Sequence, residues 1–214
     1  MLKISPLTQK LLVNEYNQPH RHHHNYDHIC YVLDVLRDYK ELFSNFEAAE
    51  LAAKFHDIVY NVDESYQYNE HKSCMKFLEI IQLDNPNFSY NSGDNDFRTA
   101  RLAIHMIKCT SGHTLNQIQD ISNFTDGEIE DIKMFLDADI KILAESEDRV
   151  IQFENDIRKE FSCYNDSTYR GGRIKVLQDF LNRPNIFMSH IGVGWEQKAR
   201  NNLQLLIDSL NNSY

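Results

Sequence analysis

Long apolar runs and closely spaced cysteines are missing from this chain of 214 residues. No stretch approaches the roughly 18 apolar residues of a membrane-spanning helix, and residues 1–6 lack the apolar core of a signal peptide. The four cysteines are far apart and form no Cys-x-x-Cys motif, so neither a zinc knuckle nor a disulfide framework is expected. We therefore expect a cytoplasmic protein that does not bind a membrane.

Signatures of nucleic-acid and nucleotide binding are missing as well. The formal net charge is −10, and lysine and arginine form no block. This argues against duplex nucleic acid as a partner, because contacts to phosphates supply most of that affinity. Gly171-Gly172 belongs to neither a GxGxxG nor a GxxxxGK[ST] motif. A small anionic substrate is compatible with this charge if a cation lies in the site.

Period-two alternation of apolar and polar residues, which is typical of half-buried strands, is not sustained anywhere. Apolar residues instead recur at helical spacing in successive segments. A hydrophobic content of 42% and a charged content of 25% are typical of a globular protein, and the length suits one core. We expect an all-α protein with seven to nine helices, folded as a single domain over residues 1–214.

Helix starts are expected where a capping residue precedes an apolar helical pattern. The predicted N-caps are Ser5, Ser44, Asn69 and Thr125. Proline follows Ser5 and is favoured at the first position of a helix. Ser44 and Thr125 are each followed three residues later by glutamate, which is the pattern of a capping box.

Residues 49–60 carry a histidine and a carboxylate side by side within a helical apolar pattern. Leu51, Phe55 and Val59 recur at helical spacing, so His56 and Asp57 are expected on a helix packed into a core. A buried carboxylate is costly without a partner, and a bound cation would compensate both its charge and the imidazole lone pair. The pair is a candidate half of a metal site; alternatively, Asp57 hydrogen-bonds His56 or nearby backbone.

A histidine-rich run occupies residues 20–28. It is internal, is interrupted by Arg21 and continues into an amphipathic pattern, so it is native sequence rather than a purification tag. His24 and His28 are four residues apart and would share one face of a helix. A metal site needs at least one of them; otherwise both are solvated or hydrogen-bonded.

Asp137 and Asp139 end a helical pattern about eighty residues further along the chain. Two residues apart on a helix, their side chains point about 200° from one another and cannot both face one ion. One of the two is therefore expected to be a cap or a group that supports the ligands.

This order of motifs resembles the HD superfamily of metal-dependent phosphohydrolases, in which a histidine, an adjacent His-Asp pair and a distal aspartate lie on helices. Over nearly the whole chain it is similar to a bacterial family of predicted HD-type hydrolases of about this length. The matching segments are Arg21 with His24 and His28, Phe55-His56-Asp57 with Tyr60, Asn69-Glu70, Thr110 with His113, Asp137-Ala138-Asp139-Ile140, Arg158-Lys159-Glu160-Phe161 and Gly172-Arg173. One departure is His23, where the family has tyrosine, which leaves the register of the histidine run open by one residue.

The resemblance implies a single HD-type helical domain that holds one divalent metal ion. The implied ligands are His24, His56, Asp57 and Asp139, with His28 as a neighbour that contacts the substrate or its phosphate. Imidazoles combined with carboxylates suit manganese, magnesium, cobalt, nickel, iron or zinc, and the extra histidines leave room for a second metal.

The expected function is hydrolysis of a phosphate ester or anhydride, in a nucleotide or another small phosphorylated metabolite, by metal-activated water. Asp57 would bind the ion and orient the water. Glu70 is the candidate general base, although the helix dipole alone also favours an acidic residue in a first turn. Arg21, Arg173 and His113 are candidates for binding the phosphate, and each arginine could equally belong to a surface ion pair.

Two other functions are open at this stage. A nucleotide-binding or regulatory module would keep the metal without turnover, and an all-helical scaffold would hold no metal. Metal-dependent phosphate release that is lost in Asp57→Ala would rule out the module, and the scaffold predicts that His56→Ala changes only stability. A homodimer is one option for the assembly.

Overall fold

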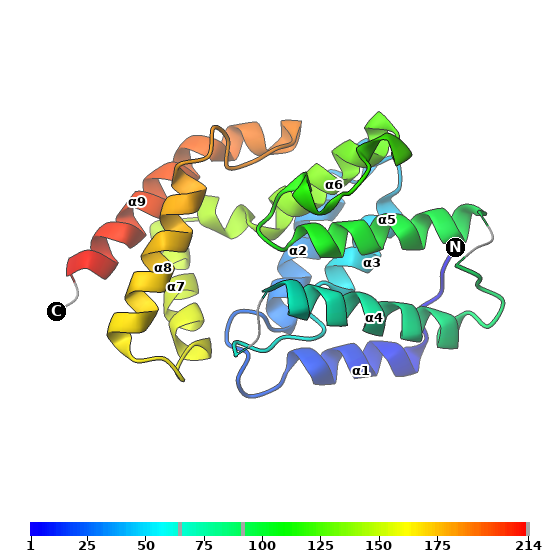
Figure 1. Cartoon of the computed structure of the whole chain (residues 1–214), viewed down its shortest axis with the longest axis horizontal. Helices are drawn as coiled ribbons and strands as arrows, with labels where there is room; N and C mark the ends of the chain where they lie inside the picture. Colours follow the sequence, from blue (N-terminus) through cyan, green and yellow to red (C-terminus); the bar gives the residue numbers. More distant parts are fainter. Residues whose placement is uncertain (64–65, 91–92, 213–214) are drawn as a thin grey trace. The chain divides into compact units, whose positions relative to one another are not determined.

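The protein is described by a computed structural model that covers residues 1–63, 66–90 and 93–212 (Figure 1). Within those ranges, all regular structure is helical, which confirms the all-α expectation at the upper end of seven to nine helices. The α-helices are α1 Pro6–Tyr16, α2 Tyr26–Asp38, α3 Phe46–Phe55, α4 Tyr66–Asp84, α5 Asn95–Cys109, α6 Asp126–Asp139, α7 Glu147–Glu160, α8 Asp166–Leu181 and α9 Glu196–Asn212. Short 3₁₀ turns are η1 Lys40–Leu42, η2 Leu115–Gln117, η3 Ile121–Asn123, η4 Lys141–Ala144 and η5 His190–Trp195.

The chain divides into two compact units, Met1–Leu136 and Asp137–Tyr214. The first contains α1 to α5 and most of α6, and the second contains the last turn of α6, η4, η5 and α7 to α9. The single domain expected from the sequence stays a prediction.

Helix α3 lies at the centre of the first unit and packs against α2, α4 and α5. Four alanines on it are fully buried, and such small side chains let neighbouring helices approach closely. At its C-terminal end the buried ring of Phe55 contacts Phe77 of α4, with centroids 5.2 Å apart. The packing of Phe55 therefore fixes the position of the backbone from which His56 and Asp57 continue.

Two of the expected N-caps are confirmed, and two are wrong. The hydroxyl of Ser5 accepts from the backbone of Thr8, and Thr125 forms its capping box with Glu128. At α3, however, the N-cap is Asn45, one residue after Ser44. Helix α4 begins at Tyr66, so Asn69 lies inside it and bonds the backbone of residue 61 instead of capping.

The start of α3 is held by a buried carboxylate rather than by Ser44 and its expected glutamate. Asp131 of α6 is fully buried, and its two oxygens accept from the backbone N–H groups of Ser44 and Asn45 at 2.8 and 2.7 Å. Burial raises the pKa of Asp131, while these two bonds oppose that rise. The carboxylate thus joins α6 to α3, two elements that contribute to the site described below.

Asp131→Ala should lower the free energy of unfolding by about 2 kcal/mol, because two charge-assisted bonds are lost around a buried position. Urea denaturation monitored by circular dichroism measures this change. Glu130→Gln is the control, since Glu130 is only half-buried and bonds Lys133 on the surface of the same helix. Equal stability of the two variants would contradict the role assigned to Asp131.

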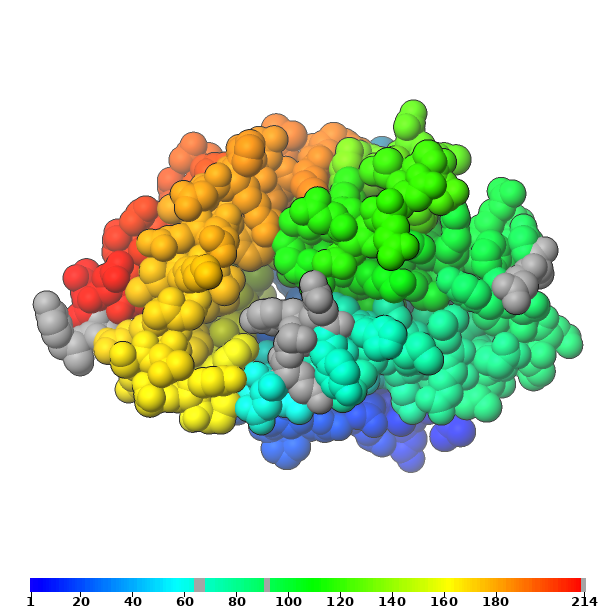
Figure 2. Space-filling view, in the orientation of Figure 1, coloured from blue at the N-terminus to red at the C-terminus, as the bar shows by residue number. Residues whose placement is uncertain are grey.

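The N-terminal segment is tied to the end of α4. The backbone N–H groups of Lys3 and Ser5 donate to Asn85 and Asp84, each at 2.8 Å. In the space-filling view, the blue N-terminal side chains accordingly border the blue-green end of α4 (Figure 2). These contacts fix α1 along one side of the first unit.

The second unit has its own core, formed by α7, α8, α9 and η4. Asn202 of α9 is buried and donates to the carbonyls of Leu143 and Glu145, which ties α9 to the segment after α6. A buried Glu154 accepts from Tyr169 and Arg173, which joins α7 to α8. Across the part of the chain that the structure describes, no helix combines the length and apolar character needed to cross a bilayer.

Candidate metal centre

Helix α3 ends at Phe55, so His56 is its C-cap and Asp57 lies beyond it. The sequence pattern predicted a helix as far as residue 60, but neighbouring side chains satisfy this backbone in another way. Arg21 donates to the carbonyls of Asp57 and Ile58 at 2.6 and 3.0 Å, and Ser73 of α4 bonds the backbone of Val59. These contacts replace the next helical turn and hold His56 and Asp57 in a fixed bend.

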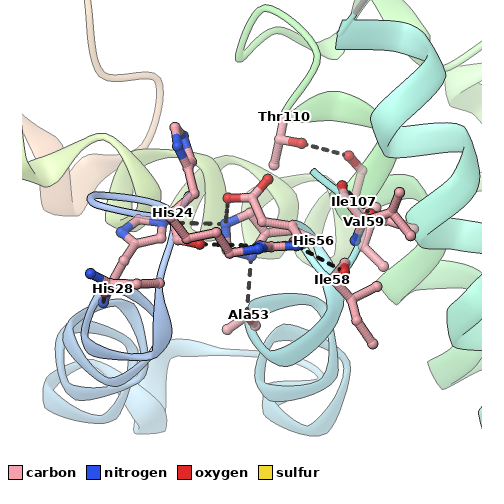
Figure 3. Close-up of polar contacts among 12 residues, drawn as sticks. His24, His28, Ala53, His56, Ile58, Val59, Ile107 and Thr110 are labelled. Atoms are coloured by element: carbon pink, nitrogen blue, oxygen red, sulfur yellow. Dashed lines mark hydrogen bonds and ion pairs between the residues drawn. The ribbon is translucent and has the colours of Figure 1, made fainter. Parts of the chain in front are cut away.

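The tautomer of His56 follows from its contact with the backbone. The ring is almost fully buried, and Nδ1 lies 3.0 Å from the carbonyl oxygen of Ala53, marked by a dashed line in Figure 3. A carbonyl oxygen can only accept, so Nδ1 carries the hydrogen. In the neutral ring, Nε2 then presents a lone pair, which is the arrangement usual for histidines that bind metals.

Two further groups meet this nitrogen. Nε2 of His28 lies 3.3 Å from Nε2 of His56, and Oδ2 of Asp57 lies 3.0 Å from it. The lone pairs of a neutral His56 and an ionised Asp57 face each other unless a cation lies between them. A proton would satisfy one such pair, whereas a metal ion would satisfy all three groups at once.

The spacing of the two imidazoles suits a shared ion. With metal–nitrogen bonds of about 2.1 Å, two ligands of one ion lie about 3.0 to 3.4 Å apart in octahedral or tetrahedral geometry. The observed separation between Nε2 of His28 and Nε2 of His56, 3.3 Å, falls within that range. The separation of the two imidazole nitrogens is therefore compatible with one shared metal ion.

His28 and His24 occupy different kinds of position, contrary to the expectation that they share a helix face. Asn25 is the N-cap of α2 and accepts from the backbone of His28, so His28 lies in the first turn and His24 precedes the helix. The ring of His24 stacks on Tyr60 with centroids 4.2 Å apart. Because Asn25 caps α2, it is His28 in the first turn, and not His24, that contacts His56.

Asp139 lies near His28 and His56 because of the way α6 packs. Phe135 of α6 packs its ring 6.0 Å from that of His56, and Asp139 lies four residues further along, on the same helix face. His28, His56 and Asp139 are all buried, and one ligand atom from each lies within 4.8 Å of the others. The structure thus brings together two of the implied ligands, His56 and Asp139, with His28; Asp57 adjoins His56, and His24 is outside this group.

Asp137 has a separate task, as expected for one of the two aspartates. Its fully buried carboxylate accepts from the backbone of Met188 at 2.8 Å and from the backbone and hydroxyl of Ser189 at 2.7 and 2.6 Å. Three donors to one carboxylate make it a structural cap of the segment before η5.

Asp137→Asn should destabilise the protein by about 3 kcal/mol, because an amide cannot accept at both of its heavy atoms. Asp139→Asn is the matched variant, and in chelator we expect a smaller loss of stability, since it also removes a negative charge from the buried group of His28, His56 and Asp139. Thermal unfolding of both proteins in chelator tests the contrast. The reverse order of stability would contradict this division of roles.

Glu70 is a buried carboxyl on α4 with little to stabilise its charge. Its side chain is 8% exposed, and Oε2 has no hydrogen-bond partner in the described part of the chain. Burial, with a smaller contribution from the charge of Asp57, raises the pKa of Glu70 to about 8, although a backbone bond and His56 oppose the rise. In the metal-free protein Glu70 therefore holds a proton at pH 7, close enough to Asp57 and His56 to feel their charges.

The three residues expected to bind phosphate lie in different settings. Arg21 is buried and donates to main-chain carbonyls, including that of His24 at 3.1 Å, so it supports the site through the backbone. His113 lies in the turn after α5, with φ of 50° and its N–H donating to Thr110. Arg173 belongs to the second unit, where it forms a 2.8 Å ion pair with Glu154.

The sequence analysis did not predict the hydrogen bond from His56 to the carbonyl of Ala53, because every residue has a backbone carbonyl, whatever its side chain. It also missed that Tyr60 pairs with His24. The signal that could have identified His28 was Asn25, a strong N-cap residue three positions before it.

Comparison of the chain with models of protein families, with curated proteins and with solved structures found no match in any of the three. The group His28, His56 and Asp139, with Asp57 beside it, is a site that could hold a metal ion.

Proposed function

We propose that the protein is a metal-dependent phosphohydrolase that acts on a nucleotide or another small phosphorylated metabolite. The observation that carries the proposal is the buried group of His28, His56 and Asp139, with the partly exposed carboxylate of Asp57 3.0 Å from Nε2 of His56. One divalent ion would offset the buried carboxylate charge and bind both imidazole nitrogens together. The resemblance to HD phosphohydrolases supports the same chemistry.

The residues of the site have distinct roles in this function. His28, His56, Asp57 and Asp139 would hold the ion, and the bond from His56 to Ala53 keeps its metal-binding nitrogen free of hydrogen. Bound there, a divalent ion supplies a water of lowered pKa and a positive charge beside the phosphoryl oxygens. Glu70 can exchange a proton near neutral pH, which suits a general acid or base.

Binding of the phosphate would fall to residues around this centre. His24 and His23 lie next to His28, with ring centroids 6.1 and 4.7 Å from its ring. Their imidazoles can donate to phosphate oxygens. Arg21 holds the bend between His56 and Tyr60 and keeps these groups in place.

The test is phosphate release from a panel of nucleotides and small phosphate esters. Chelated protein is compared with protein loaded with manganese, magnesium, cobalt, nickel, iron or zinc. We expect turnover that needs the metal and disappears in Asp57→Ala, while Asp27→Ala, an exposed residue of α2, retains it. Metal retained without any turnover would favour a nucleotide-binding module, and failure to bind any metal would reject the site.

A further inference from the structure

A cavity of about 200 Å³ lies in the first unit between α1, α2 and α3. Its walls are mainly apolar and aromatic, with two cationic side chains. The lining that matters here is Leu12, Tyr16, Ile29, Leu33, Arg37 and Lys54. An apolar cavity of about 150 Å³ is enough to hold benzene, so this one has room for a ring or a short alkyl chain.

The charged side chains that line the cavity are both positive. Arg37 and Lys54 are the charged side chains among its described lining residues, in a chain whose net charge is −10. Lys54 has no ion-pair partner in the described ranges of the chain. Arg37 pairs with Asp34, but both side chains are more than half exposed, and such pairs are weak. An anionic group entering beside Lys54 would therefore find a cation that no carboxylate neutralises.

The cavity is connected to the metal centre by two contacts. Tyr16 lines the cavity and is fully buried, and the guanidinium carbon of Arg21 lies 5.1 Å from the centre of its ring. Arg21 in turn donates to the carbonyls of Asp57 and Ile58. A ligand that moves the ring of Tyr16 would thus displace the group that fixes Asp57.

Helix α2 provides a second connection. Ile29 lines the cavity, and the preceding residue, His28, points about 100° away around the helix axis and meets His56. A shift or rigidification of this turn would therefore change both the cavity and the contact between His28 and His56.

We propose that the cavity binds a small organic carboxylate with an apolar body and that this binding changes the metal affinity of the centre. The apolar walls take the body, and Lys54 and Arg37 take the carboxylate. The coupling to the metal rests on the proposed metal centre, whereas binding in the cavity does not. The two parts therefore need separate measurements.

Binding is tested with benzoate on chelated protein, by titration followed in ¹H–¹⁵N NMR spectra. We expect saturable shifts in α1 and α2, with affinity reduced about tenfold in the Lys54→Gln, Arg37→Gln double variant. Lys10→Gln, an exposed residue of α1, should leave the affinity unchanged. Benzyl alcohol, which has the same ring without the charge, should bind more weakly. The proposal is overturned if benzoate gives no saturable shifts at tens of millimolar, or if the double variant binds it equally well.

Coupling is tested by titrating Mn²⁺ into the protein with and without saturating benzoate. We expect the affinity for Mn²⁺ to change about threefold or more, and the affinity for benzoate to change by the same factor when Mn²⁺ is present. Tyr16→Leu and Arg21→Lys, each checked for folding by circular dichroism, should reduce this factor toward one. If Mn²⁺ does not bind at all, the proposed function fails, and coupling is then read from the ring resonances of His28 and His56. Unchanged Mn²⁺ affinity, or unchanged ring resonances in that case, overturns the coupling.

Discussion

His28→Ala should lower the affinity for Mn²⁺ or Co²⁺ about a hundredfold. Structural sites with four ligands bind zinc with about 10 to 16 kcal/mol, so the loss of one ligand costs about 3 kcal/mol. His28 is buried, and its Nε2 lies 3.3 Å from that of His56, so its loss removes a nitrogen donor directly beside His56. Metal affinity is measured by calorimetry or by competition with a chelating dye, and phosphate release should fall with it.

His24→Ala is the matched control for this prediction. The two histidines are four residues apart, but the ring of His24 stacks on Tyr60 and lies outside the group of His28, His56 and Asp139. We expect its loss to change metal affinity only a few-fold. Thermal unfolding in chelator shows whether each variant is folded. If His24→Ala loses the metal and His28→Ala keeps it, the ligand set implied by the family resemblance holds instead.

Glu70→Gln should reduce phosphate release about a hundredfold and leave metal affinity within a few-fold, because an amide cannot exchange the proton that general acid–base catalysis requires. Glu79→Gln, an exposed residue of the same helix, serves as the control. Measurement of kcat and of metal affinity in both variants separates a proton-transfer role from a ligand role. Loss of metal in Glu70→Gln would place Glu70 among the ligands.

The same carboxyl should make stability depend on pH in the metal-free protein. The unfolded chain releases the proton near the ordinary pKa of 4.5, and the folded protein releases it near 8. Between these values the folded state binds more protons, so this contribution to stability is full below pH 4.5 and is lost as the pH rises through about 8.

Glu70→Gln removes this loss, so the variant should be more stable than the wild type above pH 8, by a few kcal/mol. Urea denaturation at several pH values in chelator measures the difference. Added metal should reduce it, because a nearby cation favours the carboxylate. A difference that does not change between pH 5 and pH 9 would contradict the raised pKa.

The fold class could be predicted from the sequence because helical periodicity is a local property. Helix ends were less predictable, since distant side chains decide them. Asp131 lies more than eighty residues from Asn45, yet it bonds the backbone where α3 begins. Arg21 and Ser73 satisfy the backbone after His56, so α3 ends where the apolar pattern alone would continue it.

The candidate site was predictable in its residue types and less so in its members. The pair His56-Asp57 was singled out from its residues, and Asp139 was chosen over Asp137 from the family resemblance. In the structure, Asp137 accepts from three backbone and hydroxyl donors. The choice between His24 and His28 depends on which residue caps α2, a one-residue difference that periodicity does not resolve. The raised pKa of Glu70 comes from burial, which only the tertiary structure reveals.

Because α3 ends at the candidate metal centre, the direction of its dipole would favour one order of binding. The C-terminal end of a helix carries about half a negative elementary charge, and His56 is the C-cap of α3. This field adds to the charges of Asp57 and Asp139, so it attracts a cation and repels a free phosphate. We therefore expect the metal to bind first and the phosphorylated substrate second, with substrate affinity that disappears as the metal is withdrawn.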